Sequence, residues 1–326
     1  MNFQERLLPT SPDLAFREEG YYVWGASMFR WNGAYYLCYA RWKKEYGFDA
    51  WVTHSEIALA KSDRPDGRFV PVKKLFPVDG ASGWDRDCAH NPTVIQWKGR
   101  IVLYYMANYG NGEYWNHRNH QRIGCAWTTD PEGEWSKSDG PVIDISAEGV
   151  DSLMTSNPSA CVRPDGRILM VYKAVSKYGA MPKGGDVICA AALAPEPWGP
   201  FEKFGEPLMV NPENGWSVED PFIWYDRFEG CYYALVKDFQ GYFTGAQKGS
   251  TALFTSLDGR HWGPSEHPLA YERVIDFGDH RLPVDNLERP QIYFEDGHPA
   301  WLLCATRVRE EDEDTFNLRI PMKEQP

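Results

Sequence analysis

The chain has 326 residues and a formal net charge of −12, so it lacks the surplus of Lys and Arg that a phosphate backbone requires. This charge argues against nucleic acid as a partner, and the lack of any 18-residue apolar run argues against a membrane partner. Aromatic residues make up 15% of the chain, which favours a ligand with flat apolar faces, such as a sugar ring.

The seven cysteines indicate free, buried thiols rather than a disulfide framework. Their number is odd, no pair has CxxC spacing, and most lie in apolar runs, as Cys38 and Cys304 do. This usage suggests a reducing compartment. Residues 1–20 contain no basic segment followed by an apolar one, so we expect a cytoplasmic or periplasmic protein with no signal peptide in this chain.

Five segments of the chain repeat one pattern, in which a short polar motif precedes an apolar run, a turn and a second apolar run. The segments are 24–42, 90–108, 156–174, 219–238 and 288–307. The equivalent positions in the polar motifs are Gly25, Asn91, Asn157, Asp220 and Arg289. Their period of about 65 residues is long enough for a small sheet with large connecting loops.

Each repeat predicts a β-hairpin, because a glycine stands where a tight turn needs a positive φ. The turns are Asn32-Gly33, Lys98-Gly99, Asp165-Gly166, Glu229-Gly230 and Asp296-Gly297. A third strand follows in each of the first four repeats, at residues 55–63, 121–130, 186–194 and 250–259. A fourth, outer strand comes next, as in Phe69–Pro77 and Pro207–Val210.

Four strands repeated five times predict an all-β fold, a five-bladed β-propeller with four antiparallel strands per blade. The last repeat has a third strand at Phe316–Ile320 and then the sequence ends. The stretch Glu5–Pro9 is similar to the missing outer strand, so we expect the N-terminus to close the last blade and remove an open sheet edge. No linker divides the chain, which predicts a single domain over residues 1–326.

The Xaa-Pro pairs that open the inner strands, together with the Tyr-Tyr hairpins, resemble those of the five-bladed glycosidase superfamily that includes families 43, 32, 68 and 117. The pairs are Asn91-Pro92, Asn157-Pro158, Asp220-Pro221 and Arg289-Pro290. The resemblance implies a funnel on the propeller axis with carboxylates at the starts of the inner strands. It further implies an exo-acting glycosidase, which attacks terminal residues of a glycan or oligosaccharide by acid–base catalysis.

The resemblance assigns catalytic roles to Glu288 and Asp220. Glu288 falls in the Glu-Xaa-Pro position of the general acid, and Asp220 in the position of an Asp-Pro carboxylate that stays ionised and orients or tunes. The first repeat has Gly25 where the family places its base, so we predict Asp87 as the base and Asp151 as its reserve. Arg289 is expected to point away from the acid.

Other polar and aromatic residues are predicted to bind the substrate. Four cations near the ends of second strands suggest an anionic sugar, a uronate or a sulfated residue, or else a structural network with the carboxylates: Arg41, Lys173, Lys237 and Arg307. The remaining predicted contacts are His90, Asn91, Asn157, Glu219, His54 and Trp24. No metal-ligand or nucleotide-binding motif is present, so neither metal nor cofactor is expected.

Three other functions compete with hydrolysis at this point. A glycan-binding propeller without activity would agree with Gly25 in place of the expected carboxylate. A glycoside phosphorylase could hold phosphate with Lys173, Lys237 and Arg307. A protein-interaction propeller is the weakest alternative, since WD and kelch signatures are missing.

Overall fold

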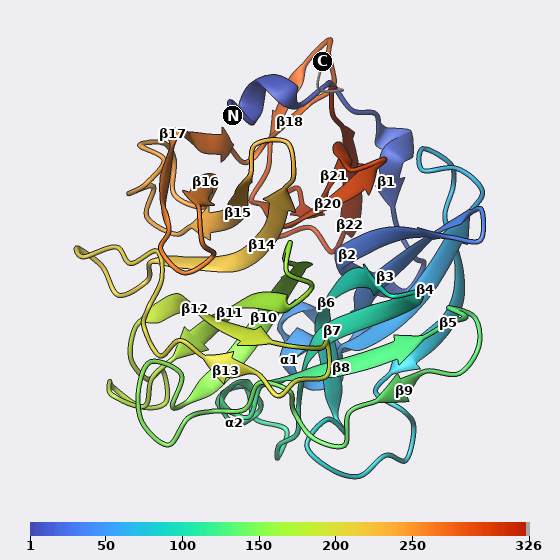
Figure 1. Ribbon diagram of the computed structural model, residues 1–326. Helices are drawn as coiled ribbons and strands as arrows, with labels where there is room; N and C mark the ends of the chain where they lie inside the picture. The colour runs from blue at the N-terminus through green and yellow to red at the C-terminus, as the bar shows by residue number, and fades with distance from the viewer. Residues whose placement is uncertain (324–326) are drawn as a thin grey trace.

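The computed structural model describes residues 1–323 and contains five four-stranded antiparallel sheets around a common axis, as Figure 1 shows. This confirms the predicted five-bladed β-propeller. The five hairpin glycines all have positive φ, between +68° at Gly230 and +87° at Gly297, as the turn positions predicted.

The first four blades use consecutive strands. Blade one contains β2 (Tyr21–Trp31), β3 (Ala34–Lys43), β4 (Glu56–Ser62) and β5 (Val70–Phe76). Blade two contains β6 (Cys88–Trp97), β7 (Arg100–Asn108), β8 (Arg122–Thr128) and β9 (Ser136–Lys137). Blade three contains β10 (Met154–Val162), β11 (Ile168–Val175), β12 (Val187–Ala194) and β13 (Glu202–Lys203). Blade four contains β14 (Val218–Asp226), β15 (Cys231–Asp238), β16 (Ser250–Ser256) and β17 (Gly263–Tyr271).

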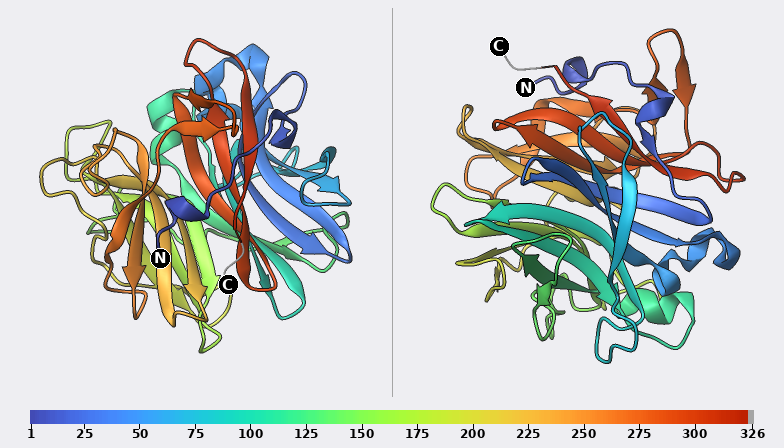
Figure 2. Two further views of the ribbon diagram at one scale, coloured as in Figure 1. Left: turned by 90° about the horizontal axis from the view of Figure 1, so that it is seen from above. Right: turned by 90° about the vertical axis from the view of Figure 1, so that its right-hand side faces the viewer.

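The fifth blade joins strands from both ends of the described chain, and in both views of Figure 2 the N-terminal segment (dark blue) lies beside the last strands (red). Its strands are β20 (Asn286–Glu295), β21 (His298–Arg307), β22 (Thr315–Pro321) and, from the N-terminus, β1 (Ala15–Phe16). The predicted closing strand Glu5–Pro9 is wrong in position. Only an isolated bridge from Leu7 to Met322 pairs there, whereas Ala15 and Phe16 form the ladder with β22.

The outer strands depart from the sequence prediction in a second place. The expected strand at Pro207–Val210 makes one bridge, from Leu208 to Cys189, and the outer strand of blade three is the two-residue β13. Outer strands this short carry too little periodicity to be located from sequence.

The inner strands begin earlier than the Xaa-Pro pairs suggested. Each pair lies inside its strand at a β-bulge; in β14, for example, the pairing register shifts between Glu219 and Phe222. A bulged residue is left out of the ladder, so a proline without an N–H is tolerated there. The same shift occurs in β2, β6, β10 and β20.

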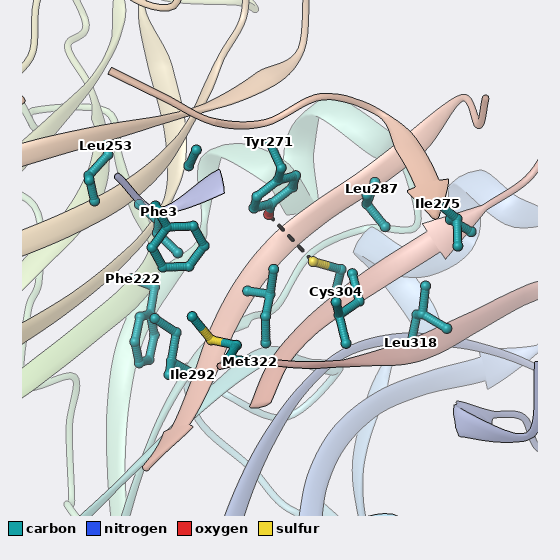
Figure 3. Close-up of a cluster of buried hydrophobic side chains, with 14 of the residues drawn as sticks. Phe3, Phe222, Leu253, Tyr271, Ile275, Leu287, Ile292, Cys304, Leu318 and Met322 are labelled. Atoms are coloured by element: carbon teal, nitrogen blue, oxygen red, sulfur yellow. Dashed lines mark hydrogen bonds between the residues drawn. The ribbon is translucent and has the colours of Figure 1, made fainter. Parts of the chain in front are cut away.

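Apolar side chains between neighbouring blades form the core. Figure 3 shows the cluster between blades four and five, where Phe3 from the N-terminus packs among Phe222, Leu253 and Ile292, and the Cys304 thiol lies 3.4 Å from the Tyr271 hydroxyl. All seven cysteines are free, and six of them are buried.

The remaining regular elements are short. Helices α1 (Trp51–His54) and α2 (Tyr114–Asn119) lie in the loops between second and third strands of blades one and two, and the hairpin of β18 (Val274–Asp276) and β19 (Arg281–Pro283) precedes β20. Across residues 1–323, every helix is too short or too polar to span a bilayer.

Candidate active site

Five equivalent bulge residues, one per blade, form what we call the axial ring: Gly25, Asn91, Asn157, Asp220 and Arg289. All five have φ between +36° and +57°, a region that side chains other than Asn and Asp rarely adopt. The four members that have side chains, from Asn91 to Arg289, are linked by hydrogen bonds. Asn91 Nδ2 donates to Asn157 Oδ1 at 2.7 Å, Asn157 Nδ2 donates to Asp220 Oδ1 at 2.6 Å, and Arg289 Nη1 donates to Asp220 Oδ1 at 3.4 Å.

The bulge explains how two adjacent residues serve one site. In a regular strand, neighbouring side chains point to opposite faces of the sheet. The positive φ at Asp220 and the register shift redirect its side chain, so that Glu219 and Asp220 line the same cavity. In blade five, Glu288 and Arg289 share that cavity in the same way.

This axial cavity has a volume of about 140 Å³. Its lining is mainly polar on the side of blades two to five and aromatic on the side of blade one, where His90 of blade two completes the aromatic part. The polar lining is Asn91, Gln121, Asn157, Lys173, Glu219, Asp220, Glu288 and Arg289. The aromatic lining is Trp24, Trp42, Phe48, Trp51 and His90.

Lysines bridge the carboxylates of neighbouring blades at the cavity. Lys173 of blade three contacts Glu219 Oε2 of blade four at 2.6 Å. Lys237 of blade four contacts Glu219 Oε1 at 3.2 Å and is hydrogen-bonded to Glu288 Oε2 of blade five. Glu219 and Glu288 are 14% and 13% exposed, so this chain of ion pairs is reachable from solvent.

The strand register explains why these lysines face the site. Lys173 lies opposite Ser156, and Lys237 lies opposite Glu219. Ser156 and Glu219 each come one residue before a ring position. Each lysine therefore lies beside the axis and reaches the carboxylate of the following blade.

Burial and neighbouring charges together separate the pKa values of the two adjacent carboxyls. Burial would raise the pKa of Glu219, but the charges of Lys173 and Lys237 and their hydrogen bonds outweigh burial and lower it to about 2. Burial, followed by the charge of Glu219, raises the pKa of Asp220 to about 6, although Arg289 opposes that shift. At neutral pH, Glu219 is ionised, while Asp220 can still take up a proton.

His90 is a neutral wall residue. Burial and then the charge of Arg289 lower its pKa to about 3, and its Nδ1 lies 2.7 Å from the Ser55 hydroxyl. The imidazole packs against Trp42 and Trp51, with ring centroids 5.7 and 5.1 Å away.

A larger cavity of about 540 Å³ lies beside the axial one and shares Trp42 with it. The predicted base Asp87 and the predicted contact His54 line this neighbouring cavity and are not among the residues lining the axial one. Asp87 Oδ2 accepts a hydrogen bond from the Gly110 amide at 2.9 Å, and His54 stacks on Tyr46 with centroids 4.2 Å apart.

Two of the four predicted cations lie outside the axial cavity. Arg41 forms ion pairs with Glu18 and Glu56. Arg307 donates to backbone carbonyls of residues 310 and 312 and lies over the Phe48 ring at 4.2 Å.

The strand register explains why Arg41 and Arg307 lie outside the axial cavity. The positions equivalent to Lys173 and Lys237 are Ala40 in blade one and Ala305 in blade five. Arg41 is one residue beyond Ala40, so its side chain leaves the other face of the strand. Arg307 is two residues beyond Ala305.

The reserve base also lies elsewhere. Asp151 is buried against Lys203 at 2.7 Å and the Tyr172 hydroxyl at 2.9 Å. Residues 1–323 contain no group of three or more His, Cys, Asp or Glu arranged to hold a metal ion.

Several solved structures with the same architecture are described as glycoside hydrolases. No protein-family model and no curated protein matches the chain. A family 117 glycoside hydrolase from the marine bacterium Zobellia galactanivorans is 18% identical, with a TM-score of 0.68 over 97% of this chain and 89% of that one. The chain shares its fold.

Two further structures have the same propeller. A thermostable family 43 glycoside hydrolase is 14% identical, with a TM-score of 0.65 over 98% of both chains. An α-L-arabinofuranosidase from Lactobacillus brevis is 15% identical, with a TM-score of 0.61 over 98% of this chain and 94% of that one. At these identities the likeness establishes the fold.

The propeller brings residues to the site that sequence reasoning missed. Arg289 was expected to point elsewhere, but it lines the axial cavity and contacts Asp220. Its place in the Xaa-Pro repeat could have revealed this, because the other ring positions were already read as axial. Phe48 and Gln121 come from loops between strands, and no repeat pattern indicates them.

Proposed function

We propose that the chain is an O-glycosyl hydrolase that removes sugar residues from the end of a glycan or oligosaccharide. The observation that carries this proposal is the convergence of Glu219, Asp220 and Glu288 on one cavity. Hydrolysis of a glycosidic bond needs one carboxyl to donate a proton and a second to assist water or attack the anomeric carbon. The shared fold of known glycosidases agrees with this chemistry.

The shape and lining of the axial cavity favour attack at a chain end. About 140 Å³ is below the 300–1,000 Å³ typical of pockets for larger ligands, so the cavity suits a single terminal residue. Trp24, Trp42 and Trp51 form an apolar wall on which the C–H face of a sugar can stack, opposite the carboxylates.

We assign the proton donor to Asp220 rather than to Glu288. Glu288 uses Oε2 for Lys237 and Oε1 for the Asn286 amide at 3.2 Å. Asp220 Oδ1 is engaged by Asn157 and Arg289, whereas Oδ2 has no donor within hydrogen-bond distance among residues 1–323. A free oxygen and a pKa of about 6 suit a group that must hold and release a proton near neutral pH.

We assign the ionised partner role to Glu219. Its pKa of about 2 keeps it charged, and its two lysine contacts fix its orientation while leaving further lone pairs to accept a proton from water or to face the anomeric carbon. Glu288 would then hold Lys237 in place. In this scheme Glu219 takes the role of base that was predicted for Asp87, which lines the neighbouring cavity.

The four cations predicted from sequence do not support an acidic substrate. Lys173 and Lys237 are neutralised by Glu219 and Glu288, and Arg41 and Arg307 are engaged away from the cavity. These pairings agree better with the structural network that the sequence left open.

The test of this proposal is product release. The protein is incubated with a panel of plant and algal oligosaccharides, with and without inorganic phosphate, and the products are separated by anion-exchange chromatography. Hydrolysis predicts free monosaccharide in both conditions. A sugar phosphate formed only with phosphate would indicate a phosphorylase, and binding without any product would indicate a glycan-binding propeller.

A further inference from the structure

Arg289 is an unusual residue for its position. It occupies the ring position of blade five with φ +54°, and its side chain is 1% exposed. Its only contact with an opposite charge among residues 1–323 is the 3.4 Å interaction of Nη1 with Asp220 Oδ1. A buried guanidinium normally has several acceptors, because an unpaired buried charge is costly.

The other side of this guanidinium lacks partners. Nε and Nη2 are both buried and have no hydrogen-bond acceptor in residues 1–323. These two nitrogens carry the parallel N–H groups on one side of the guanidinium, and this fork matches the two oxygens of a carboxylate. A carboxylate offers a separate oxygen to each of these N–H groups, whereas a water molecule has a single oxygen to offer to both.

Gly25, the ring position without a side chain, lies next to this fork. In blades two to five the ring position has a side chain, but blade one has none. A Cβ built on Gly25 would lie 3.5 Å from Arg289 Nε and 3.5 Å from Asn91 Oδ1, at ordinary contact distance from both. The gap in the ring is therefore beside the unpartnered donors.

Asn91 and Arg289, the ring neighbours of Gly25, both line the axial cavity. We propose that the Arg289 fork binds the carboxylate of a sugar acid, so that the terminal residue recognised in the axial cavity is a uronic acid. The inference rests on the proposed function in treating this sugar acid as a substrate, but the binding site itself can be tested by binding alone.

The charges that line the cavity make a monoanion more favourable than a dianion at this position. Glu219, Asp220 and Glu288 face Lys173, Lys237 and Arg289, three of each sign, and Glu219 and Glu288 are already held by the lysines. A phosphate dianion would meet more repulsion from these carboxylates than a sugar carboxylate would.

The experiment measures binding by isothermal titration calorimetry at pH 6. The probes are glucuronate, galacturonate and mannuronate, each paired with its neutral parent sugar, and inorganic phosphate. We expect at least one sugar acid to bind about tenfold or more tightly than its parent, as a bidentate charged contact provides. Equal binding of every acid and its parent would overturn the proposal, and so would binding of phosphate alone.

Two variants test the position of the site. Gly25→Asp places a tethered carboxylate beside the fork, so it should remove the preference for sugar acids. Asp is among the residues that best tolerate positive φ. The matched control is Gly20→Asp, at φ +80° in a turn with nothing within 4 Å of its Cβ, which should keep the preference.

Arg289→Lys retains the charge without the fork and should also lose the preference, with circular dichroism as a check of folding. A G25D protein that folds and still prefers sugar acids would place the anion elsewhere and refute the assignment. The hydrolase proposal would survive that result, because release of a neutral sugar does not depend on the fork.

Discussion

Replacing Asp220 with Asn tests the assignment of the proton donor. The substitution keeps the shape of the side chain and a carbonyl oxygen for Asn157 and Arg289, but it removes the proton that the leaving oxygen needs. Loss of general acid catalysis should lower kcat by roughly 10²–10⁴-fold on natural oligosaccharides. The loss should be smaller on aryl glycosides, whose phenolate leaves with little protonation.

The pH profile gives the second part of this prediction. A pKa of about 6 means that the donor is protonated below pH 6 and becomes ionised above it. The kcat/KM of the wild type should therefore fall by about tenfold per pH unit well above pH 6, and this limb should be missing in Asp220→Asn. The assay is release of monosaccharide from pH 4 to 9 at constant ionic strength.

The matched control is Asp151→Asn, another buried aspartate, which contacts Lys203 outside the axial cavity. It should lower stability and leave the alkaline limb in place. If Asp220→Asn keeps both its rate and the limb while Glu288→Gln loses them, the donor is Glu288, as the sequence predicted, and the reasoning from the free oxygen is refuted.

Three further substitutions test the rest of the site. Glu288→Gln should lower kcat less than Asp220→Asn and keep the alkaline limb; a larger loss would contradict the assigned roles. Glu219→Gln breaks a pair of ionic contacts at a side chain only 14% exposed and should lower the free energy of unfolding by about 3 kcal/mol at pH 7. Because the pKa of Glu219 is lowered from 4.5 to about 2, this difference in denaturant unfolding should shrink as pH falls from 4.5 to 2, and a constant difference would be evidence against the ion pairs. Trp51→Ala should raise KM about tenfold with little change in kcat, while Trp216→Ala, at an exposed tryptophan outside the axial cavity, should leave KM unchanged.

The repeat made the fold predictable, because hairpin turns and apolar runs are local features. Gly33 and Gly99 each end a run of strand formers at a position that only a few residues tolerate, and five such turns at one period leave few architectures. The edges of the blades were harder to predict. β1 and β13 are two residues long, so no alternation marks them, and they form because a neighbouring strand edge is available.

The candidate site was predicted only where the repeat itself positions a side chain. Asp220 and Glu288 lie in the repeated motif, and both line the axial cavity. Asp87 and the four cations were chosen from sequence nearness to the ends of strands, and nearness does not tell which face of a strand a side chain leaves. Lys173 and Lys237 reach the carboxylates of the axial cavity, whereas Asp87, Arg41 and Arg307 do not. Arg289 occupies the same repeat position as the other ring members, but the bulge that turns its side chain inward was not recognised from the sequence.

The most direct test of the central claim is the identity of the first product released from an oligosaccharide that the protein binds. The reaction is followed over time by mass spectrometry in water enriched in ¹⁸O. The account predicts a monosaccharide as the first product, with ¹⁸O on its anomeric carbon, and no release by Asp220→Asn within the same period. Binding without cleavage for the whole panel, or equal release by Asp220→Asn, would contradict it.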